Sequence, residues 1–176
     1  ARILGQVIPT YISDNIGGAH WLKLMINLNN TLPALTNYTI SQVSADPYLS
    51  RLVVGLLREA FPIIDRAGIE LESLPSVPVG LFRLVGRLPI GLVAWFLRAS
   101  PFGRESSWPR LGSTLQSIRR GRPTEIDYLN GEIVQLGERV GMPTPVNARI
   151  VELVHHVEQT GQFYSVEAIR QSIGEV

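Results

Sequence analysis

The chain has 176 residues, of which 45% are hydrophobic, and its formal net charge at pH 7 is +1. This length is typical of a single domain with a substantial apolar core, and the composition excludes a disordered chain. The near-zero charge argues against a nucleic-acid partner. The lack of cysteine excludes disulfides and thiolate metal sites. Of the three histidines, His20 is far from the others in sequence, and His155 and His156 are neighbours whose side chains point apart on a helix, so they do not predict a metal site either.

The first residues indicate the end of another unit. Residues 1–9 predict the end of a helix and residues 10–13 a short strand, with Pro9 between them. No secretion signal is visible, so we expect a cytoplasmic protein, and the opening stretch looks cut from something longer. We therefore expect residues 1–15 to be a remnant of a preceding domain and residues 16–176 to form the domain itself.

The next segments predict two long helices. The first begins near Gly17, after a cap at Asp14 or Asn15, and runs to about residue 32, where a proline kinks it rather than ends it. Residues 36–45 are polar and predict a turn. The second helix has an aspartate cap followed by proline at position 47, and Gly68 ends it.

Residues 74–109 contain five prolines and several apolar clusters. They predict one or two short helices with Arg83 and Arg87 on one side. The stretch 77–102 is the one to check for a membrane span, but three arginines and a central proline argue against a spanning helix. Its apolar surface needs a partner, which is the domain's own core, a second subunit in a homodimer, or a membrane surface.

The last third of the chain predicts four helices, at residues 113–120, 124–140, 145–160 and 165–173. The second of these carries an apolar seam that we expect in the core, formed by Ile126, Leu129, Ile133, Leu136 and Val140. Gly131 and Gly137 within the seam predict the close approach of another helix. The fold class is therefore all-α, a helical bundle with a short N-terminal strand remnant.

The helix at residues 20–31 is mostly apolar with one polar edge. Lys23, Asn27 and Thr31 fall at i, i+4 and i+8, so they share that edge. Lys23 is the only lysine, against fifteen arginines. An ammonium can act as an acid whereas a guanidinium cannot, so this lysine is a candidate for chemistry. The alternative is a lysine whose stem covers apolar surface.

A second polar group surrounds residues 113–125. Ser113 is predicted to open one helix and Glu125 the next, so both side chains can point into the gap between elements. Ser113 is alternatively a simple N-cap, and Glu125 is alternatively a first-turn carboxylate that the helix dipole favours.

These stretches resemble a known family. STLQSIRRGRPTEIDYLNGEIVQLGERVGMPTPVN, at residues 113–147, resembles the signature of the C-terminal domain of ketopantoate reductases (2-dehydropantoate 2-reductases). AHWLKLMINLNNTLPALT, at residues 19–36, is similar to that family's lysine helix. The resemblance covers nearly the whole chain and is weakest at residues 74–110. It implies a helical domain like those of ketopantoate reductases and 6-phosphogluconate dehydrogenase-like reductases.

The resemblance also implies roles for the residues of the polar edge. Lys23 matches the family's catalytic proton donor, and Asn27 matches an asparagine that contacts the substrate. Thr31 stands where the family has a second substrate-binding asparagine, with Asn30 adjacent. This departure leaves the identity of the 2-keto acid open.

In the second group, Ser113 matches the family's substrate-contacting serine. Glu125 matches a glutamate that faces both the active-site cleft and the cofactor, so its implied role is catalytic and cofactor-binding. We expect Lys23, Asn27, Ser113 and Glu125 to converge on one cleft.

The family reduces 2-dehydropantoate to pantoate, in pantothenate and coenzyme A biosynthesis, with NADPH bound mainly by an N-terminal Rossmann domain. This sequence has no G-x-G-x-x-G motif. The resemblance thus implies a C-terminal domain that needs its own Rossmann domain and is inactive alone. The rival interpretation is a non-catalytic helical module for dimerisation or partner binding. A weaker rival is a peripheral membrane module that uses residues 77–102.

Overall fold

The computed structural model describes residues 13–75, 77–99 and 111–175. Within these ranges the secondary structure is helical, apart from one isolated antiparallel bridge between Leu74 and Val77. The predicted all-α class is therefore confirmed. The predicted strand at residues 10–13 and the helix before it lie outside the described residues, except for Ser13.

The predicted first long helix is nearly continuous but changes its winding. It begins as α1 (Ile16–Asn27), tightens into the 3₁₀ turn η2 (Leu28–Asn30) and continues as α2 (Thr31–Thr36). The side chain of Asn15 caps α1 by accepting a hydrogen bond from the amide of Gly18, at 2.9 Å. Six apolar side chains of these three consecutive elements are almost fully buried: Leu22, Met25, Leu28, Leu32, Ala34 and Leu35.

Residues 36–45 were predicted to form a turn, and this was wrong in part. They contain α3 (Ile40–Ala45), which begins with a capping box. The hydroxyl of Thr39 accepts from the amide of Gln42, and the side chain of Gln42 accepts from the amide of Thr39. These reciprocal bonds satisfy the first amides of a six-residue helix whose composition alone indicates a loop.

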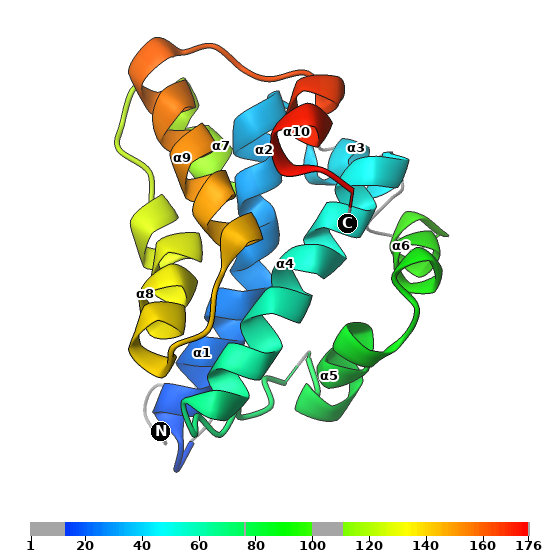
Figure 1. Ribbon diagram of the computed structural model, residues 1–176, viewed down its shortest axis with the longest axis vertical. Coiled ribbons are helices and arrows are strands. Elements are labelled where there is room, and N and C mark those ends of the chain that lie inside the picture. The colour runs from blue at the N-terminus through cyan, green and yellow to red at the C-terminus, as the bar shows by residue number, and fades with distance from the viewer. Residues whose placement is uncertain (1–12, 76, 100–110, 176) are drawn as a thin grey trace, which may run out of the picture.

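The central element is α4 (Pro47–Arg66), the predicted second long helix. Asp46 caps it by accepting from two amides, each at 2.9 Å. α5 (Val79–Arg87) and α6 (Ile90–Ala99) lie on one side of α4, and α8 (Asn130–Val140) and α9 (Pro145–Thr160) lie on the other (Figure 1). Residues 74–109 were predicted to form one or two short helices, and α5 and α6 confirm this with two.

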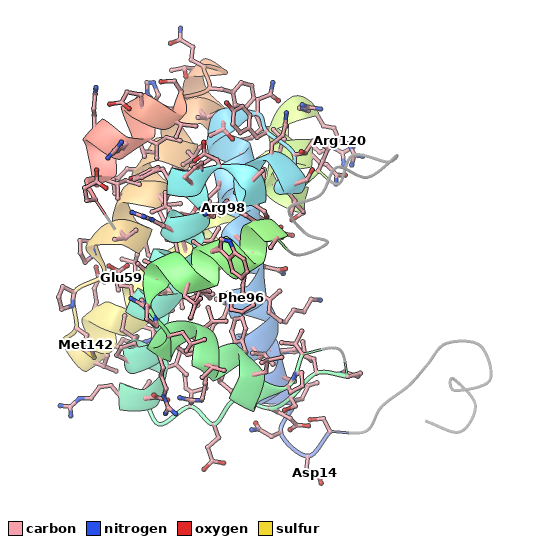
Figure 2. All side chains as sticks on the ribbon, turned by 90° about the vertical axis from the view of Figure 1, so that its right-hand side faces the viewer. Asp14, Glu59, Phe96, Arg98, Arg120 and Met142 are labelled. Carbon is pink, nitrogen blue, oxygen red and sulfur yellow. The ribbon has the colours of Figure 1, made fainter. Side chains whose placement is uncertain are left out.

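The surface of α5 and α6 is only partly covered by the core. Val93 and Ala94 are buried. Five large apolar side chains remain exposed on the two helices: Leu81, Leu84, Leu92, Trp95 and Phe96. Figure 2 shows Phe96 on the side of the molecule where these two helices lie. No helix of the described ranges is long and apolar enough to cross a membrane.

The C-terminal helices follow the predicted order with one break. α7 (Ser113–Arg119), α9 and α10 (Val166–Ile173) match their predicted ranges closely. The helix predicted at residues 124–140 is instead the 3₁₀ turn η3 (Ile126–Tyr128) followed by α8, because Leu129 leaves helical geometry at φ −111° and ψ −95°. Glu125 therefore precedes a 3₁₀ turn and does not open an α-helix.

The apolar seam lies in the core despite this break. Ile126, Leu129, Ile133 and Leu136 are buried, and Val140 is partly buried against the cluster that contains Ile133 and Leu136. The predicted close approach of another helix accounts for the two glycines only in part, since a Cβ on Gly137 would contact Ile63 of α4 at 3.5 Å. A Cβ on Gly137 would lie 2.7 Å from both the carbonyl oxygen of Met142 and the Thr144 methyl, so Gly137 makes room mainly for the turn that follows α8. A Cβ on Gly131 would meet only the preceding turn.

Candidate functional site

The polar edge of α1 is present as a row on the surface of the domain. Lys23 is exposed and Asn27 is half-buried one helical turn later. Asn30, in η2, donates from Nδ2 to Oδ1 of Asn27 at 3.4 Å. A 3₁₀ turn places residues three apart on the same side, so the winding of η2 brings Asn30 next to Asn27. The row offers one ammonium and two amide groups to a ligand.

Thr31 does not lie on the accessible part of this row. Its side chain is fully buried, and its hydroxyl donates to the carbonyl of Leu28 at 2.8 Å. This local bond holds the turn where α1 passes into α2. The half-buried Asn30 is the more accessible of the two neighbours.

Ser113 is brought to the end of the row by the packing of α7. α7 packs against α2 and η2. A Cβ on Gly112 would lie 3.0 Å from the carbonyl oxygen of Asn30 and 3.4 Å from its Cα, so the two backbones approach with no side chain between them. Exposed Ser113 therefore follows directly on a residue in contact with Asn30. The start of α7, which carries Ser113, and the end of the row at Asn30 are thus neighbours, although about eighty residues separate them in sequence.

Glu125 occupies a separate segment. It is exposed and stands just before η3, which packs against α8 and α9. The amide of the preceding residue, Thr124, donates to Glu158 at 2.7 Å and fixes this turn. Among the described residues, no hydrogen bond or ion pair joins Glu125 to Lys23 or Ser113. The expected convergence of Glu125 with the row therefore stays a prediction.

A charged cluster of Asp127, His155 and Glu158 adjoins this turn. His155 bonds Glu158 through Nδ1 at 2.7 Å and Asp127 through Nε2 at 3.0 Å. Burial alone would lower the pKa of His155, but the hydrogen bonds and charges of the two carboxylates outweigh it and raise the pKa. Burial likewise opposes ionisation of Glu158, yet bonds from Thr124 and His155 lower its pKa overall. The cluster anchors the segment that carries Glu125.

Two asparagines of the signature have a structural role that the sequence did not reveal. Asn130 and Asn147 are fully buried, and Nδ2 of Asn130 donates to Oδ1 of Asn147 at 2.9 Å. Asn147 in turn donates its side-chain amide to Glu59 of α4 at 2.6 Å. Glu59 also accepts from the backbone amides of Val146 and Asn147, at 2.9 and 2.8 Å. A carboxylate from α4 thus caps the start of α9.

Neither spacing nor residue type pointed to this cap. Thr144, which occupies the N-cap position of α9, makes no side-chain capping bond. The sequence separation between Glu59 and its partners hides the interaction, because a cap is normally sought next to its helix. The signal available in the sequence was two asparagines at the starts of neighbouring apolar helices. Amides at such positions are costly to bury unless they are paired.

The geometry defines a helical bundle whose surface carries a lysine, two asparagines and a serine. Residues 15–158 match the family model described as ketopantoate reductase PanE/ApbA C terminal. This chain therefore belongs to the ketopantoate reductase C-terminal domain family. A 2-dehydropantoate 2-reductase of Mesorhizobium japonicum is 30% identical over 155 residues, which are 88% of this chain and 41% of that protein.

Solved structures agree with this assignment. A PanE/ApbA family ketopantoate reductase from Ralstonia eutropha JMP134 superposes with a TM-score of 0.65 at 26% identity, over 89% of this chain and 46% of that one. A D-mandelate dehydrogenase in a ternary structure with NADH and anilino(oxo)acetate has a TM-score of 0.63 at 22% identity, over 85% of this chain and 43% of that one. The second likeness shows the fold alone. The chain spans less than half the length of the curated relatives it matches.

Proposed function

We propose that this chain is the substrate-binding and catalytic half of a cytoplasmic, NADPH-dependent reductase. Its substrate is a 2-keto acid, 2-dehydropantoate, and its product pantoate enters pantothenate and coenzyme A biosynthesis. The observation that carries the proposal is the row of Lys23, Asn27 and Asn30, which ends beside Ser113. The family assignment supplies the reaction, and 2-dehydropantoate 2-reductase is the name of the relatives.

The donors of the row suit a keto acid. Reduction adds a hydride to the carbonyl carbon and a proton to the carbonyl oxygen, on which negative charge develops. The ammonium of exposed Lys23 stabilises that charge and gives its proton to the oxygen. Asn27 and Ser113 hold the hydroxyl and carboxylate ends of the substrate through neutral donors, which fix orientation without competing for the proton.

The second substrate-binding asparagine of the family is replaced here by a pair of residues. We propose that Asn30 supplies the amide, while Thr31 supports it by holding the turn through its bond to Leu28. Asn30→Ala should raise KM with little change in stability. Thr31→Val should lower stability and leave KM nearly unchanged. The reverse pattern in steady-state kinetics and urea melts would assign the contact to Thr31.

This chain can hold only one part of the cofactor. The sequence lacks a glycine-rich phosphate loop, so the pyrophosphate needs a separate Rossmann domain. Glu125 is exposed and anchored by its neighbours, so it can meet a cofactor ribose or orient Lys23 from across a cleft. When bound, NADPH supplies the hydride. The residues of this chain hold the substrate and move the proton.

The experiment joins this chain to a Rossmann domain of the same family and tests Lys23. Lys23→Arg keeps the charge but loses the transferable proton, and Lys23→Ala loses both. Each should lower kcat by about 100-fold or more. NADPH binding should stay within a few fold, because the other domain holds most of the cofactor.

Arg66→Ala, which removes an exposed cation of α4 far along the chain from the row, is the control and should leave kcat unchanged. If Lys23→Arg retains most of the activity, Lys23 acts through charge or packing alone. The chain without the Rossmann domain should fold but not oxidise NADPH with 2-dehydropantoate. Turnover by this chain alone at about 1 per second would contradict the two-domain proposal.

Self-association is a second candidate function. The exposed apolar side chains of α5 and α6 favour it, since Leu81, Trp95 and Phe96 are each more than half exposed. Analytical ultracentrifugation of the chain, compared with Trp95→Glu, tests this. A concentration-dependent dimer that dissociates in the variant supports a second subunit, and a monomer at all concentrations excludes it.

A further inference from the structure

A groove lies between α4 and α5, away from the polar row of α1. It has a volume of about 460 Å³ and is open to solvent on one side. Seven residues of the two helices line it: Arg58, Phe61, Pro62, Asp65, Arg83, Gly86 and Arg87. The four residues of α4 are spaced at i, i+3, i+4 and i+7, so they form one face about 10 Å long.

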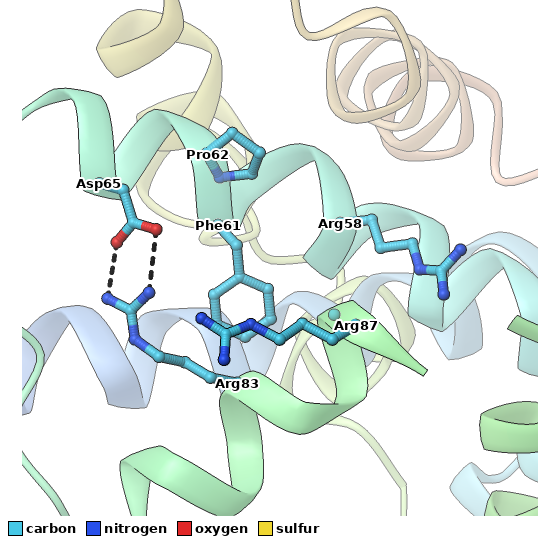
Figure 3. Close-up of a pocket in the computed structure, with 7 residues that line it drawn as sticks. Arg58, Phe61, Pro62, Asp65, Arg83 and Arg87 are labelled. Carbon is cyan, nitrogen blue, oxygen red and sulfur yellow. Dashed lines mark hydrogen bonds and ion pairs between the residues drawn. The ribbon is translucent and has the colours of Figure 1, made fainter. Parts of the chain in front are cut away.

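Gly86 determines how close α5 lies to this face. A Cβ at Gly86 would lie 2.8 Å from Cδ2 of Phe61, so only glycine lets α5 rest directly on the phenyl ring. Arg83 and Arg87, three residues before and one residue after Gly86, then stand on either side of the contact. The floor of the groove is apolar and its rims are cationic (Figure 3).

Two of the three arginines already have partners. Arg83 makes a two-pronged ion pair with Asp65, with N–O distances of 2.9 and 2.6 Å. This hydrogen bond lowers the pKa of Asp65, so the carboxylate stays charged and is matched by Arg83. Arg58 donates to the carbonyl of Leu88 at the end of α5. Both arginines are thereby held in place as walls of the groove.

Arg87 is different. It is exposed, and it makes no hydrogen bond or ion pair with any other residue in the described part of the chain. In Figure 3 its guanidinium extends across Phe61 toward Arg83. The groove lining carries two more positive than negative charges, and the planar fork of Arg87 is free to pair with an oxyanion.

We propose that this groove binds a small organic oxyanion. Its phosphate or carboxylate group pairs with Arg87, and its apolar part lies on Phe61 and Pro62. Arg58 supplies a second positive charge, whereas the charge of Arg83 is already matched by Asp65, so the anion pairs with Arg87. The site is formed by α4 and α5, whereas the polar row of Lys23 and Asn27 lies on α1, so binding here does not depend on the reductase function.

The test titrates the ¹⁵N-labelled 176-residue chain with inorganic phosphate and, separately, with succinate, at ionic strength held constant with sodium chloride. The amide signals of Gly86 and Arg87 should shift and saturate. Arg87→Gln should weaken binding by about 10-fold or more, the worth of a charge-assisted hydrogen bond. Arg66→Gln removes an equal charge from the end of α4, outside the groove, and it should change the dissociation constant by less than about 2-fold.

Gly86→Ala is the second variant. It keeps every charge but forces α5 away from Phe61, so it should also weaken binding. Tighter binding of phosphate or of succinate identifies the preferred group, and either result supports the site. Unsaturable shifts, or equal weakening by Arg66→Gln and Arg87→Gln, would show general surface charge and overturn the proposal. Binding of a tetraglutamate peptide with neither small anion bound would overturn it in favour of a protein partner.

Discussion

Removal of the Glu59 carboxylate should be among the most destabilising single changes in this domain. Glu59→Ala removes the acceptor of two backbone amides at the start of α9 and of the side-chain amide of Asn147. Asn147 is fully buried, so water cannot replace the lost acceptor there. A buried donor left unpaired costs about 1 to 3 kcal/mol. Because the amide of Val146 is only half-buried and can be partly rehydrated, the expected total is about 3 kcal/mol.

Urea denaturation followed by circular dichroism measures this loss as a shift of the midpoint at constant slope. Glu59→Gln keeps the shape and one carbonyl acceptor, so its cost should be about 1 kcal/mol. Glu138→Ala removes an exposed carboxylate of α8 and should change stability by less than about 0.5 kcal/mol. If Glu59→Ala costs no more than Glu138→Ala, the capping of α9 by α4 contributes nothing and the reasoning fails.

Three further predictions concern the core, the charged cluster and the base of the site. Leu129→Ala, in the buried seam, should cost about 2 to 5 kcal/mol in urea melts, and a loss below about 0.5 kcal/mol would place the seam in solvent. The pKa of His155 is raised, so the stability that its charged form contributes is fully present below the ordinary pKa of 6.5 and is lost as pH rises through the raised pKa. The pKa of Glu158 is lowered, so its charged form contributes stability above pH 4.5. The stability difference between wild type and His155→Gln should therefore be larger at pH 6 than at pH 9, and an equal or larger difference at pH 9 would contradict the assignment. Gly112→Ala should destabilise by about 1 to 3 kcal/mol because it crowds the backbone of η2, whereas Gly80→Ala, with open space around it, should be neutral or stabilising by up to about 1 kcal/mol; equal effects would show that the contact is loose.

Much of the fold was predictable because the residues that start and end its helices act on backbone groups only a few positions away. Asn15 and Asp46 cap their helices through bonds within a few residues, and Gly141 and Gly161 end theirs with positive φ. The break at Leu129 was not predictable from the apolar seam. A 3₁₀ turn followed by an α-helix can bury the same residues as one continuous helix, so the spacing of the seam does not distinguish them.

The site was predictable only where one helix carries it. The i, i+4 spacing placed Lys23 and Asn27 on one edge, and the structure keeps them on α1. Extending the same rule to Thr31 assumed unbroken α-helical winding, whereas η2 turns Thr31 into the core and leaves Asn30 beside Asn27. The meeting of this edge with Ser113 depends on tertiary packing, for which a single sequence contains no local signal.

The contact of Gly112 with the backbone of Asn30 limits how the base of the site can move. Two main chains in direct contact have no rotamer to change, so the backbones at Gly112 and Asn30 have little room to shift relative to one another. Such a preorganised floor adds no ordering cost when substrate arrives. In the proposed reductase, opening and closing over the row would then come from another part of the protein, and variants that loosen this contact should slow the chemical step more than they alter access.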